Sequence, residues 1–275
     1  MAVVGHVEWV TFARVTQLPE AGEIVHAEAV WDEAAGGGGV AAVQLARLTG
    51  DCLFITALGT DSEGERCADR LHGLGVDLQA ARRSRTRRAF THTDAAGERT
   101  ITVLGDRLVP CGADDLPWAA LAGRDAVYFT GGDAAAVRAA RAARVLVATP
   151  RGAEVLTAAG VPIDALVHSG GDPAEMSWAA DLAGAGIPLG YVVATAGGSG
   201  GRWTAGDGTT GQWAAADLEG PVVDAYGCGD SFAAGLTLAL GRGEGIAAAV
   251  SFGAACGARC LTGAGPYGAD LRSLA

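Results

Sequence analysis

The segment from Asp224 to Phe232, read as Asp-Ala-Tyr-Gly-Cys-Gly-Asp-Ser-Phe, combines glycines and carboxylates at a spacing suited to catalysis. Apolar residues recur at helical spacing from Phe232 onward, so Gly227 and Gly229 lie where a helix begins. A glycine-rich turn at a helix N-terminus presents free N–H groups to a phosphate or a developing oxyanion. Asp230 beside that turn could accept the proton of an attacking hydroxyl, which indicates phosphoryl transfer. The simpler alternative is that Asp230 only favours the helix dipole and the glycines only close a turn.

The complete absence of lysine excludes several other mechanisms. All 20 basic residues of the 275-residue chain are arginine. P-loop enzymes, protein kinases and enzymes that form a Schiff base each depend on a lysine. Any phosphoryl transfer by this chain must therefore rely on glycines, backbone amides, arginines and Mg²⁺.

The composition of the chain limits its expected size class, binding partner and compartment. With 275 residues, of which 49% are hydrophobic, the chain can bury the core of one main domain. A formal net charge of −11 argues against nucleic acid or an anionic membrane as partner, and favours a small molecule. No long apolar stretch and no basic leader is present, so we expect a cytoplasmic protein. The six cysteines show no paired C-x-x-C spacing, and we expect reduced thiols, with Cys256 and Cys260 as core residues more than as metal ligands.

Short apolar runs alternate with helical patterns along most of the chain. This order predicts an α/β fold with a mainly parallel sheet and helices on both faces. The predicted strands are 1–7, 52–58, 126–130, 145–148, 165–168 and 189–194, and the predicted helices are 40–48, 61–73, 133–143, 151–159, 173–184, 229–240 and 244–261. Residues 24–31, 87–94 and 99–104 depart from the alternation and favour an antiparallel ribbon, with a turn at Asp94 to Gly97.

Three motifs carry a resemblance to one known family. The Asp224 to Phe232 segment is similar to the C-terminal signature of the ribokinase-like (PfkB) carbohydrate kinases, with Cys228 in place of the usual alanine. Residues 35–48 resemble the family's glycine-rich helix start, and residues 193–201 resemble its nucleotide loop. The stretch from Gly59 to Gly64 matches a G-x-D-x-x-G motif that we interpret as structural. The resemblance implies a ribokinase-like three-layer α/β/α sandwich over 1–275, with a small β lid formed near 8–34 and 86–106.

The resemblance also implies an activity and its residues. It implies an ATP- and Mg²⁺-dependent transfer of the γ-phosphoryl group to a hydroxyl of a sugar-like molecule. Asp230 is the implied base, and the amides of Gly227, Cys228 and Gly229 form the implied anion hole. The implied nucleotide-binding residues are Thr195, Gly197, Gly200 and Ala255. The implied acceptor-binding residues are Glu8, Gly36, Gly37, Gly38, Val40, His92 and Arg99. Asp172 is the implied magnesium contact, through water, and Asp224 is the residue implied for a K⁺ ion.

Several positions depart from the family pattern. Glu8 stands near the place of an acceptor-binding aspartate, and Val40 replaces an asparagine. The N-x-x-E motif reads Ser169-Gly170-Gly171-Asp172, which predicts a weaker metal site or an unusual acceptor. A cluster of arginines precedes the predicted hairpin: Arg82, Arg83, Arg85, Arg87 and Arg88. The cluster either lines a solvated strand edge or contacts an anionic acceptor such as a sugar phosphate. Arg99 could make the same contact.

Other functions remain as alternatives. A kinase-fold protein that binds a metabolite or nucleotide with little catalysis would retain the same glycines, and a nucleoside kinase would share the signature. Gly197 to Gly201 also fits the G-x-S-x-G pattern of hydrolases, but no helix pattern follows Ser199, and all five histidines precede it. A dinucleotide-dependent oxidoreductase is disfavoured, because the chain lacks the G-x-G-x-x-G motif that begins a helix in such enzymes.

The exposed edge of the predicted lid favours a homodimer.

Overall fold

The computed structural model describes residues 1–274, and its centre is a nine-stranded sheet. The strand order is β13-β12-β11-β10-β9-β8-β1-β4-β5. All neighbours from β5 to β11 are parallel, and β12 and β13 extend the sheet antiparallel. The strands are β1 Ala2–Val4, β4 Leu53–Gly59, β5 Asp77–Arg83, β8 Ala126–Phe129, β9 Val145–Ala148, β10 Ile163–Ser169, β11 Leu189–Thr195, β12 Gly201–Ala205 and β13 Thr210–Trp213.

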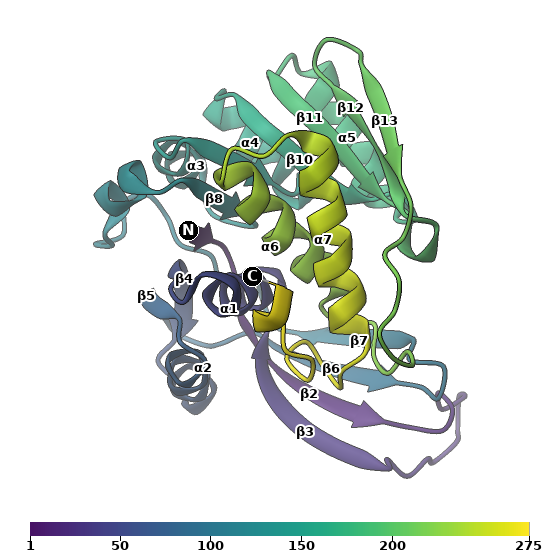
Figure 1. Cartoon of the computed structure of the whole chain (residues 1–275). Coiled ribbons are helices and arrows are strands. Elements are labelled where there is room, and N and C mark those ends of the chain that lie inside the picture. Colours follow the sequence, from purple (N-terminus) through teal and green to yellow (C-terminus); the bar gives the residue numbers. More distant parts are fainter. Residues whose placement is uncertain (275) are drawn as a thin grey trace.

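Helices cover both faces of this sheet, as Figure 1 shows. Successive residues of a strand point to opposite faces: Val3 packs into the core beneath α1, α2, α6 and α7, whereas Ala2 and Val4 pack into the core beneath α3, α4 and α5. The result is a three-layer α/β/α sandwich. The helices are α1 Gly37–Thr49, α2 Ser62–Gly73, α3 Ala134–Ala140, α4 Ala153–Ala159, α5 Pro173–Gly184, α6 Cys228–Gly241 and α7 Ile246–Leu261.

The direction in which strands are added reverses at β1. From β1 the chain adds β4 and β5 on one side, and it later returns to add β8 to β11 on the other side. In open parallel sheets, such a switch point leaves a crevice beyond the carboxyl ends of the strands. The order of the strands therefore places a ligand crevice between the ends of β1 and β8.

A second, four-stranded sheet lies beside the large one (Figure 1). Its order is β3-β2-β6-β7, with strands β2 Glu8–Arg14, β3 Ala29–Ala35, β6 Arg88–Thr93 and β7 Arg99–Leu104. The predicted hairpin of β6 and β7 is confirmed. The extended segment predicted at 24–31 was placed too early, because residues 24–28 lie in an exposed loop and the strand runs to residue 35.

Most of the predicted α/β alternation is confirmed, since each predicted helix is present: the helix at 173–184 has the predicted bounds, and the others are shifted at one or both ends. None of the predicted strands covers β5 or β13 at the edges of the large sheet, β12 next to β13, or β2 within the predicted lid. All six cysteines are free thiols, and Cys256 and Cys260 are buried. Within residues 1–274, no helix is long and apolar enough to cross a membrane.

Candidate functional site

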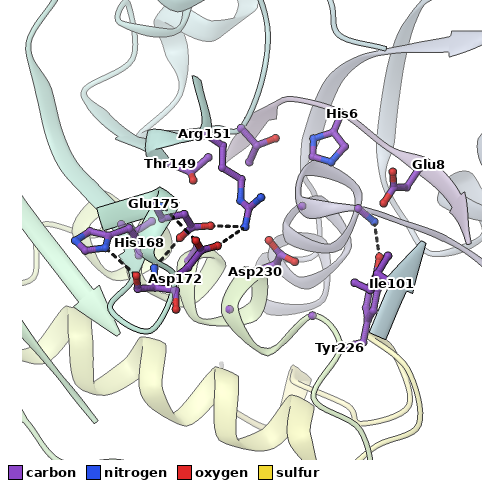
Figure 2. A pocket seen from close by; sticks show the side chains of 18 of the residues that line it. His6, Glu8, Ile101, Thr149, Arg151, His168, Asp172, Glu175, Tyr226 and Asp230 are labelled. Atoms are coloured by element: carbon purple, nitrogen blue, oxygen red, sulfur yellow. Dashed lines mark hydrogen bonds and ion pairs between the residues drawn. The ribbon is translucent and has the colours of Figure 1, made fainter. Parts of the chain in front are cut away.

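A cavity of about 620 Å³ opens at the crevice where the strand order reverses. One wall consists of residues that end or directly follow the parallel strands: His6, Thr130, Thr149, Arg151, Ser169 and Thr195. The opposite wall comes from the small sheet, through Glu8, Arg99, Ile101 and Val103. Asp230, at the start of α6, faces the same space (Figure 2). We call this space the polar cavity.

A second cavity of about 360 Å³ adjoins the first. Its walls are mostly apolar or glycine-rich, and they come from the turn after β11, the segment after β13, and helices α6 and α7. The lining residues include Gly197, Gly198, Gly200, Trp213, Leu218, Phe232, Ala254, Gly257 and Ala258. Thr195 and Gly229 line both cavities, so the two spaces meet at these residues. We call the second space the apolar cavity.

The first turn of α6 lies at this junction. Gly227 caps the helix with a φ of 82°, and a Cβ there would lie 2.8 Å from Pro266 Cβ. Only glycine fits both the left-handed backbone and the close approach. Within residues 1–274, the N–H groups of Gly229 and Asp230 have no backbone acceptor. The predicted glycine-rich helix start is confirmed, and its free donors face the space shared by the two cavities.

The Asp230 carboxylate lies close to the start of α1. A Cβ on Gly37 would lie 3.1 Å from Asp230 Oδ1. Burial in the cavity raises the pKa of the Asp230 carboxyl to about 6, although Arg99 and Arg151 oppose the shift. A carboxyl with a pKa near neutrality is suited to accept a proton from a hydroxyl and to release it again.

Several buried polar atoms of the polar cavity have no hydrogen-bond partner in the described chain. They are His6 Nδ1, Glu8 Oε2, Arg87 Nε and Thr130 Oγ1. Glu8 Oε2 and Arg87 Nε form an ion pair at 3.0 Å, but their orientation does not make a hydrogen bond. Burial raises the pKa of Glu8, and burial together with nearby arginines holds the pKa of His6 well below its usual value. A neutral imidazole and unpaired acceptors in such a space suit a ligand rich in hydroxyl groups.

Arg151 links two carboxylates on the far wall. Its guanidinium lies 2.6 Å from Glu175 Oε1 and 3.3 Å from Asp172 Oδ2 (Figure 2). Glu175 is buried and also accepts a hydrogen bond of 2.7 Å from the Ser169 N–H. Asp172 caps α5 through the N–H groups of Ala174 and Glu175. The sequence interpretation missed Arg151 and Glu175. Glu175 could have been found by searching for the glutamate of the N-x-x-E motif up to three residues beyond Asp172.

The G-x-D-x-x-G motif is structural, as predicted. Asp61 caps α2 by accepting the Gly64 N–H at 3.0 Å, and it also accepts the Thr86 hydroxyl at 2.6 Å and the Thr86 N–H at 2.8 Å. A Cβ on Gly64 would lie 2.2 Å from Gly59 O, so the turn needs a glycine there. Because Thr86 is held in this way, the next residue, Arg87, is directed into the polar cavity.

The structure separates the members of the arginine cluster. Arg83 is paired with Asp114 at 2.7 Å, and Arg82 is paired with Glu65 at 3.1 Å, both outside the cavities. Arg85 and Arg88 are exposed. Arg87 alone among the five lines the polar cavity.

The predicted catalytic and nucleotide residues are largely brought together. Gly227, Gly229 and Asp230 line the polar cavity, and Cys228 and Gly229 line the apolar one. Thr195, Gly197 and Gly200 line the apolar cavity. Ala255 does not line it, because successive helical residues turn by about 100° and Ala254 and Ala258 take that face of α7.

The predicted acceptor residues divide into two groups. Glu8, Gly36, Gly37 and Arg99 line the polar cavity. Gly38 instead lets α1 approach β1, since a Cβ there would lie 2.6 Å from His6 O. Val40 is fully buried and packs beneath Gly227. His92 pairs with Thr100 on the face of the small sheet opposite Ile101, with its ring edge-to-face on Phe90, so it does not reach the cavity.

The two predicted metal contacts also differ. Asp172 lines the polar cavity, but its carboxylate is already held by Arg151 and the α5 cap. Asp224 is fully buried outside both cavities, where Oδ1 accepts the Tyr226 N–H and Oδ2 accepts the Gly265 N–H and the Thr93 hydroxyl. In the described part of the chain, no cluster of three metal-ligating side chains is present.

The hydrolase alternative is excluded by the turn at 197–201. Ser199 is exposed in a short 3₁₀ turn, and the chain continues into strand β12 instead of a helix. A nucleophile elbow requires a helix directly after the serine.

Comparisons with known proteins point to one family. The sequence matches the family described as pfkB family carbohydrate kinase over residues 1–151 and 147–271. No curated protein matches the chain by sequence.

Solved structures of sugar and nucleoside kinases share the fold. A ribokinase-type protein from Agrobacterium tumefaciens matches with a TM-score of 0.82 and 25% identity over 99% of this chain and 94% of its own. Ribokinase from Arabidopsis thaliana, solved with ribose and ATP, has a TM-score of 0.76 and 20% identity over 99% of this chain and 96% of its own. Adenosine kinase from Sinorhizobium meliloti has a TM-score of 0.76 and 18% identity over 96% of this chain and 94% of its own. This confirms the ribokinase-like fold.

Proposed function

The chain belongs to the pfkB family of carbohydrate kinases, and from this we propose that it transfers the γ-phosphoryl group of ATP to a hydroxyl of a sugar-like acceptor. One observation carries the proposal. The two cavities meet at Thr195 and Gly229, beside the Asp230 carboxylate and the free N–H groups of α6. Direct phosphoryl transfer requires two substrates in adjoining spaces, with a base and an anion hole between them.

We assign the nucleotide to the apolar cavity. Its glycine-rich turn at 197–200 permits close approach of phosphates, and its small and apolar residues on α7 fit the flat face of a purine. The Arabidopsis ribokinase of the same fold was solved with ATP. The triphosphate would extend past Thr195 toward the N-terminus of α6, where the helix dipole favours negative charge.

We assign the acceptor to the polar cavity. The side chains of His6, Glu8 and Thr130 line this cavity and would form hydrogen bonds with its hydroxyl groups. Ile101 and Val103 of β7 would cover its apolar ring face from the small sheet. Enclosure by that sheet would limit the entry of water, which otherwise competes as a phosphoryl acceptor.

In the proposed step, Asp230 accepts the proton of the attacking hydroxyl. The new bond forms between that oxygen and the γ-phosphorus, while the bond from the γ-phosphorus to the β–γ bridging oxygen breaks and ADP leaves. The N–H groups at the start of α6 stabilise the charge on the transferred group. Magnesium, which binds few protein carboxylates and mostly phosphates and water, would neutralise the phosphate charge. Asp172 and Glu175, which line the polar cavity, would contact its waters. Asp224 lies outside both cavities, and a K⁺ ion beside it stays a prediction.

A nucleoside acceptor is the second candidate, because adenosine kinase from Sinorhizobium meliloti has the same fold. A protein that binds metabolites with little catalysis is the third, and the replacement of an expected asparagine by the buried Val40 favours it. Association of two chains through the small sheet stays a prediction.

The test measures Mg²⁺- and ATP-dependent ADP release with pentoses, hexoses, hexose phosphates and nucleosides. Asp230→Asn is assayed in parallel, with Asp69→Asn as the matched control, because Asp69 is exposed on α2 and lines neither cavity. We expect turnover to fall by about 10³-fold or more in Asp230→Asn alone, with nucleotide binding retained. Binding of ATP without turnover on any class would support the binding-protein alternative, and absence of ATP binding would contradict the assignment.

A further inference from the structure

Two arginines of the polar cavity form no ion pair within residues 1–274: Arg99, which is exposed, and Arg107, which is withdrawn further from solvent. Four arginines line it: Arg87, Arg99, Arg107 and Arg151. Arg151 is paired with Glu175 and Asp172, and Arg87 is paired with Glu8. Arg107 is half-buried, and within residues 1–274 it forms no ion pair and no side-chain hydrogen bond. A guanidinium withdrawn from water without a partner is unfavourable unless an anion joins it.

Arg107 lies near other positive groups, and these groups further favour the binding of an anion. Its own pKa is lowered by burial first and then by Arg87 and Arg151, with Glu8 as the carboxylate that opposes the shift. Burial and the same three arginines hold the pKa of His6 well below its usual value. The charge of Glu8 is itself disfavoured, because burial raises its pKa. This end of the cavity therefore holds more positive than negative charge.

The fold places this charge at the acceptor end of the cavity. Arg87 directly precedes β6 and Arg107 follows β7 by three residues, so the two flank the hairpin of the small sheet. Their neighbours Glu8 and His6 lie against Gly36, where a Cβ would be 3.2 Å from both side chains. Asp230 lies against the next residue, Gly37. The positive groups and the proposed base therefore line one and the same cavity.

We propose that the acceptor carries an oxyanion, either a phosphate monoester or a carboxylate, which binds Arg107 together with Arg87 while a hydroxyl of the same molecule faces Asp230. This proposal rests on the proposed kinase function. Guanidinium groups bind such oxyanions through two parallel hydrogen bonds, and the guanidinium of Arg107, which lines the cavity, supplies such donors. A neutral acceptor would leave Arg107 without a partner in the closed complex.

The kinetic test compares acceptors in matched pairs: ribose with ribose 5-phosphate, fructose with fructose 6-phosphate, and glucose with gluconate. We expect at least one anionic member to exceed its neutral partner by about 100-fold in kcat/KM. The phosphate and carboxylate pairs distinguish the two sources of the oxyanion. Preference for the neutral member in every pair would overturn the proposal.

Substitution of Arg107 makes the test specific to the site. Arg107→Met is expected to raise the KM of the anionic acceptor by about 10- to 100-fold with a smaller effect on kcat, and to change the KM of the neutral acceptor much less. Arg107→Lys should recover part of the affinity. Arg85→Met removes one exposed arginine outside both cavities and should have no effect. Equal KM values in Arg107→Met and the wild type would overturn the proposal.

A binding measurement separates failure of this proposal from failure of the kinase function. The wild type is titrated with inorganic phosphate by thermal shift, with the nucleotide site filled by a non-hydrolysable ATP analogue. Stabilisation that is lost in Arg107→Met and kept in Arg85→Met would support an anion site even if no acceptor is turned over. No stabilisation of the wild type, or the same stabilisation in Arg107→Met, would overturn the anion site while leaving the kinase function to its own test.

Discussion

The carboxylate of Asp230 and the backbone of Gly37 are in direct proximity, because a Cβ on Gly37 would lie 3.1 Å from Asp230 Oδ1. Gly37 has no positive φ, so alanine is compatible with its helical backbone. We expect Gly37→Ala to push the carboxylate out of line with the acceptor and to lower kcat/KM by roughly 10- to 100-fold. The free energy of unfolding should change by no more than about 1 kcal/mol.

The matched control is Gly73→Ala in α2, where nothing lies within 4 Å of the added Cβ. It should leave kinetics unchanged. Full activity in Gly37→Ala would show that Asp230 does not need this close packing against α1.

The pH dependence of activity should show one acidic limb from Asp230. Burial raises the pKa of its carboxyl to about 6, and a base must be deprotonated to accept the hydroxyl proton. We therefore expect log(kcat/KM) to fall with decreasing pH below about 6, with unit slope. The measurement is a pH profile of ADP release in the wild type. A flat profile between pH 5 and 7, with the protein still folded, would argue against Asp230 as the base.

Stability should depend on the same group in the opposite sense. The raised pKa means that the folded state holds the Asp230 proton more tightly than the unfolded state, whose value is 3.8. The contribution is present below about pH 4 and is lost as pH rises through about 6. At pH 7.5 we expect Asp230→Asn to be more stable than the wild type, on the order of 1 kcal/mol because the group is partly solvated.

Chemical denaturation at pH 7.5 and pH 4 checks this expectation. The difference between Asp230→Asn and the wild type should shrink at the lower pH, where both side chains are neutral. Asp69→Asn should show no such difference at either pH. A loss of stability in Asp230→Asn at pH 7.5 would contradict the assigned direction of the pKa shift.

The sequence predicted the site correctly wherever the residues involved are close together in the chain. Gly227, Gly229 and Asp230 are close in the chain, so the helix start and its carboxylate follow from spacing alone. The same holds for Asp61, whose cap of α2 is a local motif. In these cases a short segment specifies both the backbone and the side chain.

Residues that converge from different strands could not be predicted in this way. Arg107 follows β7, Arg151 follows β9 and Glu175 lies in α5, and only the order of the strands brings them to one cavity. Among the clustered arginines, Arg87 is selected by the contact of Thr86 with Asp61, which spans 25 residues. Of the missed strands, β5 and β13 are the edges of the large sheet and β12 lies next to β13. All three are partly exposed, and they therefore lack the apolar pattern that identifies a central strand.

Asp224 should matter mainly for stability. It is fully buried, and its oxygens accept the Tyr226 N–H at 2.9 Å, the Gly265 N–H at 3.0 Å and the Thr93 hydroxyl at 3.4 Å. These contacts join the end of β6 to the segment before α6 and the C-terminal loop. Asp224→Ala would leave buried donors unpaired, and we expect a loss of about 3 kcal/mol or more in unfolding free energy.

Asp224→Asn keeps one oxygen acceptor and should cost less than Asp224→Ala. Urea denaturation of both variants provides the measurement. A loss below about 1 kcal/mol in Asp224→Ala would show that water replaces the carboxylate at this position.

The assignment of the nucleotide to the apolar cavity predicts a difference between two alanines of α7. Ala258 lines that cavity, whereas Ala255, three residues earlier, does not. Ala258→Leu should place its side chain in the space of the base and raise the Kd of ATP by roughly tenfold or more, about 1.4 kcal/mol. Ala255→Leu carries the same chemical change on another face of the helix and should bind ATP as the wild type does. Calorimetric titration with ATP measures both. If Ala255→Leu were the weaker binder, the nucleotide would have to approach α7 from a different face, and the junction at Gly229 would no longer lie between the two substrates.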